Sequence, residues 1–245
     1  MNAFSLEGKR ILVTGASSGI GRATAIVASG LGAQVVLTAR RQNELEQTRA
    51  LCAGSGHLVL PGDVREASFL KVLLEKSAPL DGMAHVAGVS LIEPVSLFDR
   101  ARAMDVVKVN CLAFVEMIKA LARSKLRGMP FSAVAVSSVS AEVGWSGGAV
   151  YCAAKGALSS CVRALATELA PRGIRVNAVC PSNVKTPMFD AGAGRLGDEA
   201  ALLKRQPLGI GQPEQVAWPI CFLLSDAASF VTGVNLPVDG GYLAQ

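Results

Sequence analysis

The feature of this sequence that most restricts its fold is an alternation between short apolar runs and longer stretches with helical spacing. The apolar runs cover residues 10–14, 34–38, 57–60, 81–85, 131–138, 174–180 and 234–238, and the helical stretches cover 20–31, 42–53, 65–76, 99–127, 149–170 and 213–224. Strands that alternate with such helices form parallel βαβ units, and near-continuous apolar strands are typical of a sheet covered on both faces. We therefore expect an α/β fold over residues 1–245, namely a single doubly wound Rossmann-type domain with a parallel sheet of about seven strands.

Charge and cysteine usage restrict the partners and the compartment. The net charge is +5, but the basic residues are scattered and aromatic residues make up only 5% of the chain, too few to stack nucleic-acid bases. The six cysteines form no Cys-x-x-Cys pair and no metal-ligand spacing with His57 or His85. No apolar run reaches the ~18 residues of a membrane span. We expect no nucleic acid, no membrane, no metal, and a reducing, cytoplasmic location.

A glycine-rich turn follows the first predicted strand. Thr14-Gly15-Ala-Ser-Ser-Gly19-Ile-Gly21 lies between that strand and a helix, which is the context of a dinucleotide-binding turn. Glycines admit backbone angles closed to other residues and let N–H groups approach a pyrophosphate, while the helix N-terminus adds its positive dipole end. A tight turn with a purely structural role is the alternative for this segment.

The end of the second predicted strand indicates which dinucleotide binds. A site selective for NAD places a carboxylate there to bind the ribose 2′-hydroxyl, but this chain reads Thr38-Ala39-Arg40-Arg41. A guanidinium suits a 2′-phosphate because it donates paired, charge-assisted hydrogen bonds. We therefore predict NADP(H) as the preferred cofactor, with Arg40 on the 2′-phosphate. If both arginines are solvated loop cations, NAD(H) is the alternative.

Tyr151 and Lys155 are the residues that most clearly indicate chemistry. Their spacing of four places both side chains on one face of a predicted helix. A nearby ammonium favours phenolate and draws the tyrosine pKa down from its usual value of about 10. Ser138 ends the fifth predicted strand 13 residues earlier, at the sheet edge where ligands bind, and strand alternation sends Ser137 to the opposite face.

The glycine-rich turn, Ser138 and the Tyr151–Lys155 pair follow one another along the chain as in the short-chain dehydrogenase/reductase family. The sequence resembles this family over essentially the full chain. Four further segments match the family's signatures: Gly62-Asp-Val64, Ala87-Gly88, Pro181-Ser-Asn-Val-Lys-Thr186 and Val238-Asp-Gly-Gly241. Two positions depart from the family pattern. His85-Val86 stands where the family usually reads Asn-Asn, and Ser182 replaces a glycine. These departures put in question how the local polar groups are satisfied.

The resemblance implies roles for the matched residues. Ser138 would bind the substrate carbonyl, Tyr151 would exchange the proton, Lys155 would lower the tyrosine pKa and hold the nicotinamide ribose, and Asn110 would anchor a relay water. The implied cofactor-binding residues, with Asp63 on the adenine, are Gly15, Ser17, Ser18, Gly19, Ile20, Gly21, Arg40, Asp63, Val64, Ala87, Gly88, Tyr151, Lys155, Pro181, Val184 and Thr186.

The substrate pocket is less sharply defined by the sequence. We expect it to be lined or closed by Ser140, Val143, Trp145 and Met188, although Trp145 is equally suited to anchor an interface. The glycine- and alanine-rich segment 187–207 is predicted to be a mobile loop with a short helix near 199–205.

These residues predict an oxidoreductase that transfers a hydride between NADP(H) and a ketone or secondary alcohol, with Tyr151 as general acid/base. Resemblance to 3-oxoacyl-[acyl-carrier-protein] reductases adds a carrier-linked thioester as a substrate, which Arg172 and the basic residues of 123–127 would help to hold. Steroid, sugar or small-alcohol dehydrogenases are the alternatives within the family. The family also implies a homotetramer or homodimer, formed through the helices at 99–127 and 149–170.

Two other classes of protein share this fold. A non-catalytic nucleotide sensor has no need of Ser138, Tyr151, Lys155 and Asn110 together, so the complete set favours an enzyme. An epimerase or dehydratase usually carries a larger C-terminal substrate domain than the roughly 60 residues that follow Pro181. The sequence therefore favours a dehydrogenase or reductase.

Overall fold

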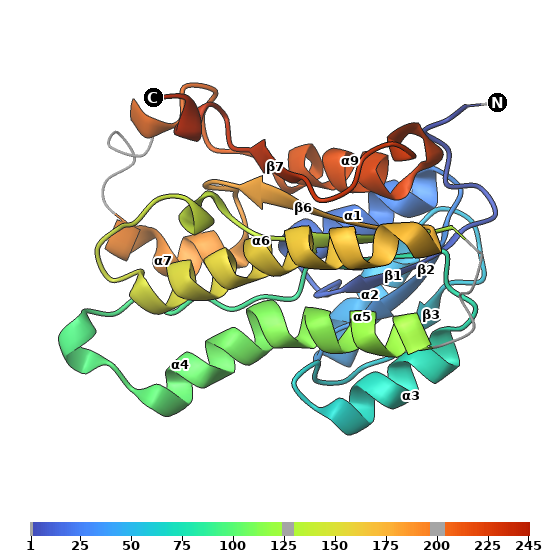
Figure 1. The fold of residues 1–245 in the computed structure, drawn as a ribbon, viewed down its shortest axis with the longest axis horizontal. Helices are drawn as coiled ribbons and strands as arrows, with labels where there is room; N and C mark the ends of the chain where they lie inside the picture. The colour runs from blue at the N-terminus through green and yellow to red at the C-terminus, as the bar shows by residue number, and fades with distance from the viewer. Residues whose placement is uncertain (1, 124–129, 197–203) are drawn as a thin grey trace.

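A seven-stranded parallel sheet forms the centre of the molecule (Figure 1). The computed structural model describes residues 2–123, 130–196 and 204–245. The strands are β1 (Arg10–Thr14), β2 (Gln34–Thr38), β3 (Leu58–Val59), β4 (Gly82–His85), β5 (Phe131–Val136), β6 (Ile174–Pro181) and β7 (Asn235–Val238), in the order β3-β2-β1-β4-β5-β6-β7. The order reverses between β1 and β4, which opens a crevice at their carboxyl ends. This arrangement confirms the predicted Rossmann-type fold.

Helices cover both faces of the sheet. One layer contains α1 (Gly19–Gly30), α2 (Gln42–Leu51) and α9 (Pro213–Leu224), and the other contains α3 (Ala67–Ser77), α4 (Arg100–Val107), α5 (Ala113–Arg123) and α6 (Ala149–Leu169). Figure 1 shows α5 and α6 in front of the strands. Within β1, Ile11 and Val13 join the core beneath α1 and α9, whereas Leu12 joins the core beneath α5 and α6. The two-residue period of a strand thus supplies both cores.

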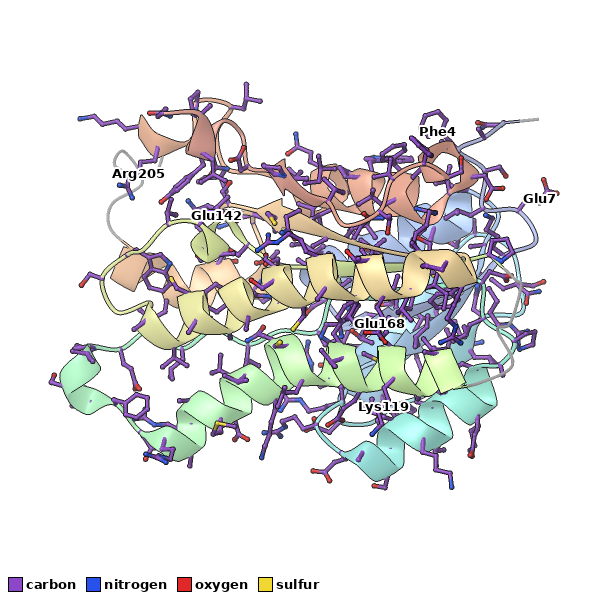
Figure 2. All side chains as sticks on the ribbon, in the orientation of Figure 1. Phe4, Glu7, Lys119, Glu142, Glu168 and Arg205 are labelled. Carbon is purple, nitrogen blue, oxygen red and sulfur yellow. The ribbon has the colours of Figure 1, made fainter. Side chains whose placement is uncertain are left out.

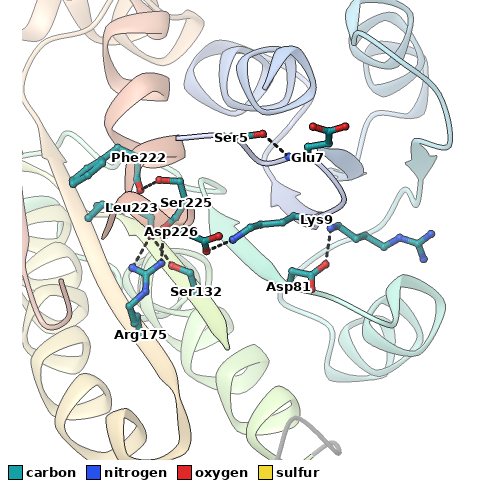
Figure 3. A network of polar contacts seen from close by, with 11 residues as sticks. Ser5, Glu7, Lys9, Asp81, Ser132, Arg175, Phe222, Leu223, Ser225 and Asp226 are labelled. Atoms are coloured by element: carbon teal, nitrogen blue, oxygen red, sulfur yellow. Dashed lines mark hydrogen bonds and ion pairs between the residues drawn. The ribbon is translucent and has the colours of Figure 1, made fainter. Parts of the chain in front are cut away.

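A polar network fastens α9 to the amino ends of the strands (Figure 3). The Arg175 guanidinium and the Ser132 hydroxyl both donate to the Leu223 carbonyl, each at 2.8 Å. Lys9 pairs with Asp226 beyond the end of the same helix. These contacts lie at the edge opposite the crevice, so they stabilise the scaffold without entering the site.

Three segments differ from the sequence-based expectation. The predicted loop 187–207 begins with a helix, α7 (Pro187–Leu196), because its small residues are compatible with helix as well as loop. Most of the predicted short helix near 199–205 falls in residues 197–203, which lie outside the described residues. The predicted single helix 99–127 contains a π-helical turn, η2 (Lys108–Leu112), between α4 and α5. The fifth strand ends at Val136, so Ser138 lies in the loop after it.

Candidate active site

A cavity of about 950 Å³ opens at the carboxyl edge of the sheet, near the upper end of the usual size for a ligand pocket. Segments after all seven strands contribute to it, and its lining contains all the predicted catalytic and cofactor-binding residues. Ser140, Trp145 and Met188 also line it. Val143 is not among the lining residues, and its carbonyl accepts the Cys152 thiol. A role for Val143 in closing the pocket remains a prediction.

The glycine turn has no room for side chains. Gly15 has a φ of +68°, and a Cβ there would lie 2.8 Å from the Ala87 nitrogen. A Cβ on Gly21 would lie 2.2 Å from the Gly15 carbonyl oxygen. At the N-cap of α1, the Ser18 side chain makes no capping hydrogen bond. The first backbone N–H groups of the helix therefore have no partner from that side chain. A pyrophosphate fits such a cradle.

The cationic end of the cavity contains two arginines that follow β2. Arg40 is exposed and lines the cavity, as expected. Arg41, which the sequence did not single out, donates to the Ser17 hydroxyl at 3.2 Å and the Ser18 hydroxyl at 3.3 Å. The polar contacts of Arg41 with the glycine turn place its guanidinium beside the phosphate cradle. The adjacency of two arginines was the only sequence signal for this second cation.

The predicted adenine ligand, Asp63, has a partner that sequence reasoning missed. Arg65 binds both carboxylate oxygens, at 3.1 Å through Nε and 2.7 Å through a terminal nitrogen. This pairing lowers the pKa of Asp63, with a smaller contribution from nearby Arg40. Arg65 also lies 3.4 Å from Asp105. Asp63 is therefore an ionised, fixed acceptor at the β3 side of the cavity.

Ser138, Tyr151 and Lys155 converge at the opposite side. The Ser138 side chain hydrogen-bonds Tyr151 and accepts the Ser140 N–H at 3.1 Å. The Lys155 ammonium lies 5.6 Å from the centroid of the Tyr151 ring and donates to the Val136 carbonyl at 2.8 Å. The Ser137 hydroxyl instead donates to the Lys155 carbonyl at 3.1 Å. The four-residue spacing on α6 thus gives the expected pair.

The pKa of the phenol differs from the expectation. Burial raises the pKa of Tyr151 to about 12, and the hydrogen bond from Ser138 offsets only part of that effect. Burial also lowers the pKa of Lys155 to about 8. Burial disfavours the charged form of each side chain. The phenol is therefore protonated in this structure, and a lowering of its pKa by Lys155 during the reaction remains a prediction.

Asn110 lies in the π-helical turn and is completely buried. Its amide nitrogen donates to the carbonyls of Val89 at 2.9 Å and Val106 at 3.0 Å, and its oxygen accepts the Val89 N–H at 3.3 Å. A Cβ on Gly88 would lie 2.8 Å from that oxygen, which explains the close approach at Ala87-Gly88. The Asn110 side chain therefore holds the turn against the loop after β4, and its part in a proton relay remains a prediction.

His85 resolves the first departure from the family pattern. It is 1% exposed, and its ring joins Thr14 Oγ1 at 3.1 Å to the Val109 carbonyl at 3.0 Å. Since Thr14 Oγ1 accepts the N–H groups of Val86 and Ala87, its own hydrogen points to His85 Nδ1, and Nε2–H donates to Val109. Burial lowers the pKa of His85 to about 4, in keeping with this neutral ring. One imidazole thus links β1, β4 and the π-helical turn.

The second departure, Ser182, also has a structural partner. Its hydroxyl donates to the Asp239 carbonyl at 2.8 Å and so ties the loop after β6 to the loop after β7.

The described residues contain no group of three or more His, Cys, Asp or Glu that could hold a metal ion. None of the described helices is long and apolar enough to cross a membrane.

Comparison with known proteins identifies the family. The family model described as enoyl-(acyl carrier protein) reductase, which represents short-chain dehydrogenases, matches residues 15–243. This chain belongs to the short-chain dehydrogenase/reductase family. It is an NAD(P)-dependent dehydrogenase or reductase.

Relatives of the chain cover nearly its full length. L-xylulose reductase of Mus musculus is 36% identical over 98% of this chain and 99% of its own. Cis-4-hydroxycyclohexanecarboxylate dehydrogenase of Sinomonas cyclohexanicum is also 36% identical, over 95% of this chain and 96% of its own. Among solved structures, a proposed 2-deoxy-D-gluconate 3-dehydrogenase of Agrobacterium tumefaciens with bound NADP has a TM-score of 0.93 and 33% identity, covering 100% of both chains.

Proposed function

We propose that this protein is an NADP(H)-dependent reductase of small polyhydroxylated ketones, or a dehydrogenase of the corresponding secondary alcohols. The observation that carries the proposal is the convergence of Ser138, Tyr151 and Lys155 in one cavity with the glycine turn. Sugar and small cyclic-alcohol substrates appear in the names of the relatives, and these names favour the sugar or small-alcohol alternative over a carrier-linked thioester.

The residues considered for an acidic carrier give that substrate no support. The Arg172 guanidinium donates to the Ala122 carbonyl, so it is engaged within the chain. Residues 124–127 lie outside the described part of the chain. The thioester reductase is therefore the weaker proposal.

The side chains divide the chemistry between them. The nicotinamide cofactor supplies the hydride in reduction and accepts it in oxidation. In reduction, Tyr151 donates its phenolic proton to the carbonyl oxygen, and its raised pKa keeps that proton available at neutral pH. The Ser138 hydroxyl donates a hydrogen bond to the same oxygen and stabilises the negative charge that develops there. Lys155, fixed by its bond to Val136, lies beside the phenol and is suited to bind the ribose hydroxyls.

The preference for NADP(H) rests on Arg40 and Arg41. Two guanidinium groups flank the glycine turn at the end of β2, and no carboxylate occupies that strand end. A 2′-phosphate would find charge-assisted donors there, whereas a 2′-hydroxyl would find no acceptor of the kind that NAD sites provide.

We also propose a homo-oligomer. Large apolar side chains are exposed along η1 (Val95–Leu97), α4 and η2, namely Val95, Leu97, Phe98, Met104 and Leu112. Apolar patches of this kind on a water-exposed helix layer are typical of subunit interfaces.

The proposed activity is tested by following NADPH absorbance with a panel of ketoses, cyclic ketones and acyl thioesters. Tyr151→Phe removes the proton donor, so we expect turnover to fall by roughly 100-fold or more while NADPH affinity stays within a few-fold. Tyr242→Phe, which alters the other tyrosine of the chain, should retain turnover of a neutral ketose. Full turnover by Tyr151→Phe would overturn this mechanism, and failure of wild type to oxidise NADPH with any carbonyl would favour the nucleotide sensor.

A further inference from the structure

The cavity has a second cationic wall that hydride transfer does not use. Lys204 and Arg205 line it together with Met188 of α7 and Tyr242 of the C-terminal turn η6 (Tyr242–Ala244). Figure 2 shows Arg205 at the same end of the molecule as α7 and this turn. Neither cation belongs to a motif identified in the sequence, so their presence in the wall follows from the tertiary structure.

Tyr242 holds the Arg205 side chain in place. A guanidinium nitrogen of Arg205 donates to the Tyr242 hydroxyl at 3.0 Å, and the guanidinium carbon lies 5.6 Å from the ring centroid. Tyr242 is itself fixed, because the Asp239 carboxylate caps its turn by accepting the N–H groups of Gly241 at 3.0 Å and Leu243 at 2.9 Å. Only one nitrogen of Arg205 is used by Tyr242, which leaves N–H donors for a ligand.

The backbone next to Arg205 is also anchored. The adjacent Gln206 is 2% exposed, and its amide oxygen accepts both N–H donors of Asn183, main-chain and side-chain, at 3.2 Å. Its amide nitrogen donates to the carbonyls of Asn183 at 2.9 Å and Gly209 at 2.7 Å. Asn183 belongs to the segment Pro181–Thr186, which contributes three of the implied cofactor-binding residues, and a Cβ on Gly240 would lie only 2.9 Å from Gln206. The position of Arg205 is thereby linked to the cofactor-binding segment.

The charges of the cavity are distributed asymmetrically. Among the described lining residues the acids are Asp63 and Asp105, and both pair with Arg65 on the side of β3. The wall that contains Lys204 and Arg205 adjoins the loops after β6 and β7, at the other edge of the sheet. No described carboxylate forms an ion pair with either cation of that wall. The charged side chains described at this end of the cavity are therefore cations.

From this geometry we infer that Arg205, assisted by Lys204, binds a carboxylate on the substrate. The substrate would then be an oxo or hydroxy acid, such as a polyhydroxylated acid, whose carboxylate lies at this wall while its carbonyl or alcohol carbon lies at Tyr151. The inference rests on the proposed function and narrows it, because that function alone includes neutral ketoses as well as acids. A planar guanidinium with free N–H donors matches a carboxylate in two-point geometry.

A kinetic comparison tests the inference. Reduction by NADPH of 5-keto-D-gluconate is compared with reduction of D-fructose, a neutral ketose of the same carbon number. Wild type should prefer the acid in kcat/KM, and added salt should reduce that preference. Arg205→Gln should lower kcat/KM for the acid about tenfold and leave fructose within about twofold. Lys119→Gln, which removes a charge from the exposed face of α5, is the matched control and should change neither value.

A binding experiment separates this inference from the proposed activity. In the presence of NADP, gluconate should raise the melting temperature of wild type more than sorbitol does, and Arg205→Gln should abolish the difference. If wild type reduces both ketones but shows no preference for the acid, or if Arg205→Gln affects both equally, the carboxylate site is refuted while the reductase stands. If neither ketone is reduced but gluconate still stabilises wild type through Arg205, the carboxylate site stands and the proposed reaction fails.

Discussion

His85 should make this protein sensitive to mild acid. Its buried ring joins Thr14 to the Val109 carbonyl, and its pKa is about 4 in the folded chain. A histidine in an unfolded chain has a pKa of about 6.5. The unfolded state therefore binds more protons between these values, so the stabilisation is complete above pH ~6.5 and is lost as the pH falls toward ~4.

The size of the effect follows from the two pKa values. The interval from 6.5 to about 4, at about 1.36 kcal/mol per pH unit, corresponds to about 3 kcal/mol of unfolding free energy when the loss is complete. At pH 5 the expected loss is about 2 kcal/mol. Lys155 also has a lowered pKa, but it titrates near pH 8 and above, so its contribution is constant over this acid range.

Urea unfolding at pH 7.5 and pH 5 measures the loss. His85→Asn places a non-titrating amide at the same position, and its unfolding free energy should fall by about 2 kcal/mol less than that of wild type over this interval. Equal pH dependence in wild type and His85→Asn would refute the assignment of a neutral, buried imidazole.

Two further predictions concern the cofactor site. Replacing both Arg40 and Arg41 by serine should lower the preference for NADPH, measured as kcat/KM with NADPH divided by kcat/KM with NADH, by about tenfold or more. The reason is that both guanidinium groups face the predicted 2′-phosphate. An unchanged ratio would show that the two arginines are solvated cations. Gly21→Ala should weaken NADPH binding by at least about tenfold in a fluorescence titration, since the new Cβ would lie 2.2 Å from the Gly15 carbonyl oxygen. Gly30→Ala, at the open end of the same helix, should bind NADPH normally, and equal affinities in the two variants would contradict the steric argument.

Interactions within short segments were predictable from the sequence. The alternation of apolar runs with helical stretches predicted the sheet, and the turn at Thr14–Gly21 predicted a phosphate cradle, because both patterns depend on local backbone geometry. The i, i+4 spacing of Tyr151 and Lys155 likewise brought the two side chains together on α6. In these cases a few adjacent residues determine the arrangement, whatever the rest of the chain does.

Contacts between distant segments determined the remaining features. The pKa of Tyr151 is raised by its burial, which depends on how other elements pack around it. His85 finds its partners on β1 and in the π-helical turn, which are 71 and 24 residues away in the sequence. Arg205 joins the cavity wall only because Gln206 and Tyr242 hold it there. The sequence alone determined the family fold and indicated which tyrosine we propose as the proton donor. The tertiary structure decided the electrostatics, because burial and charge pairing arise only when remote segments pack together.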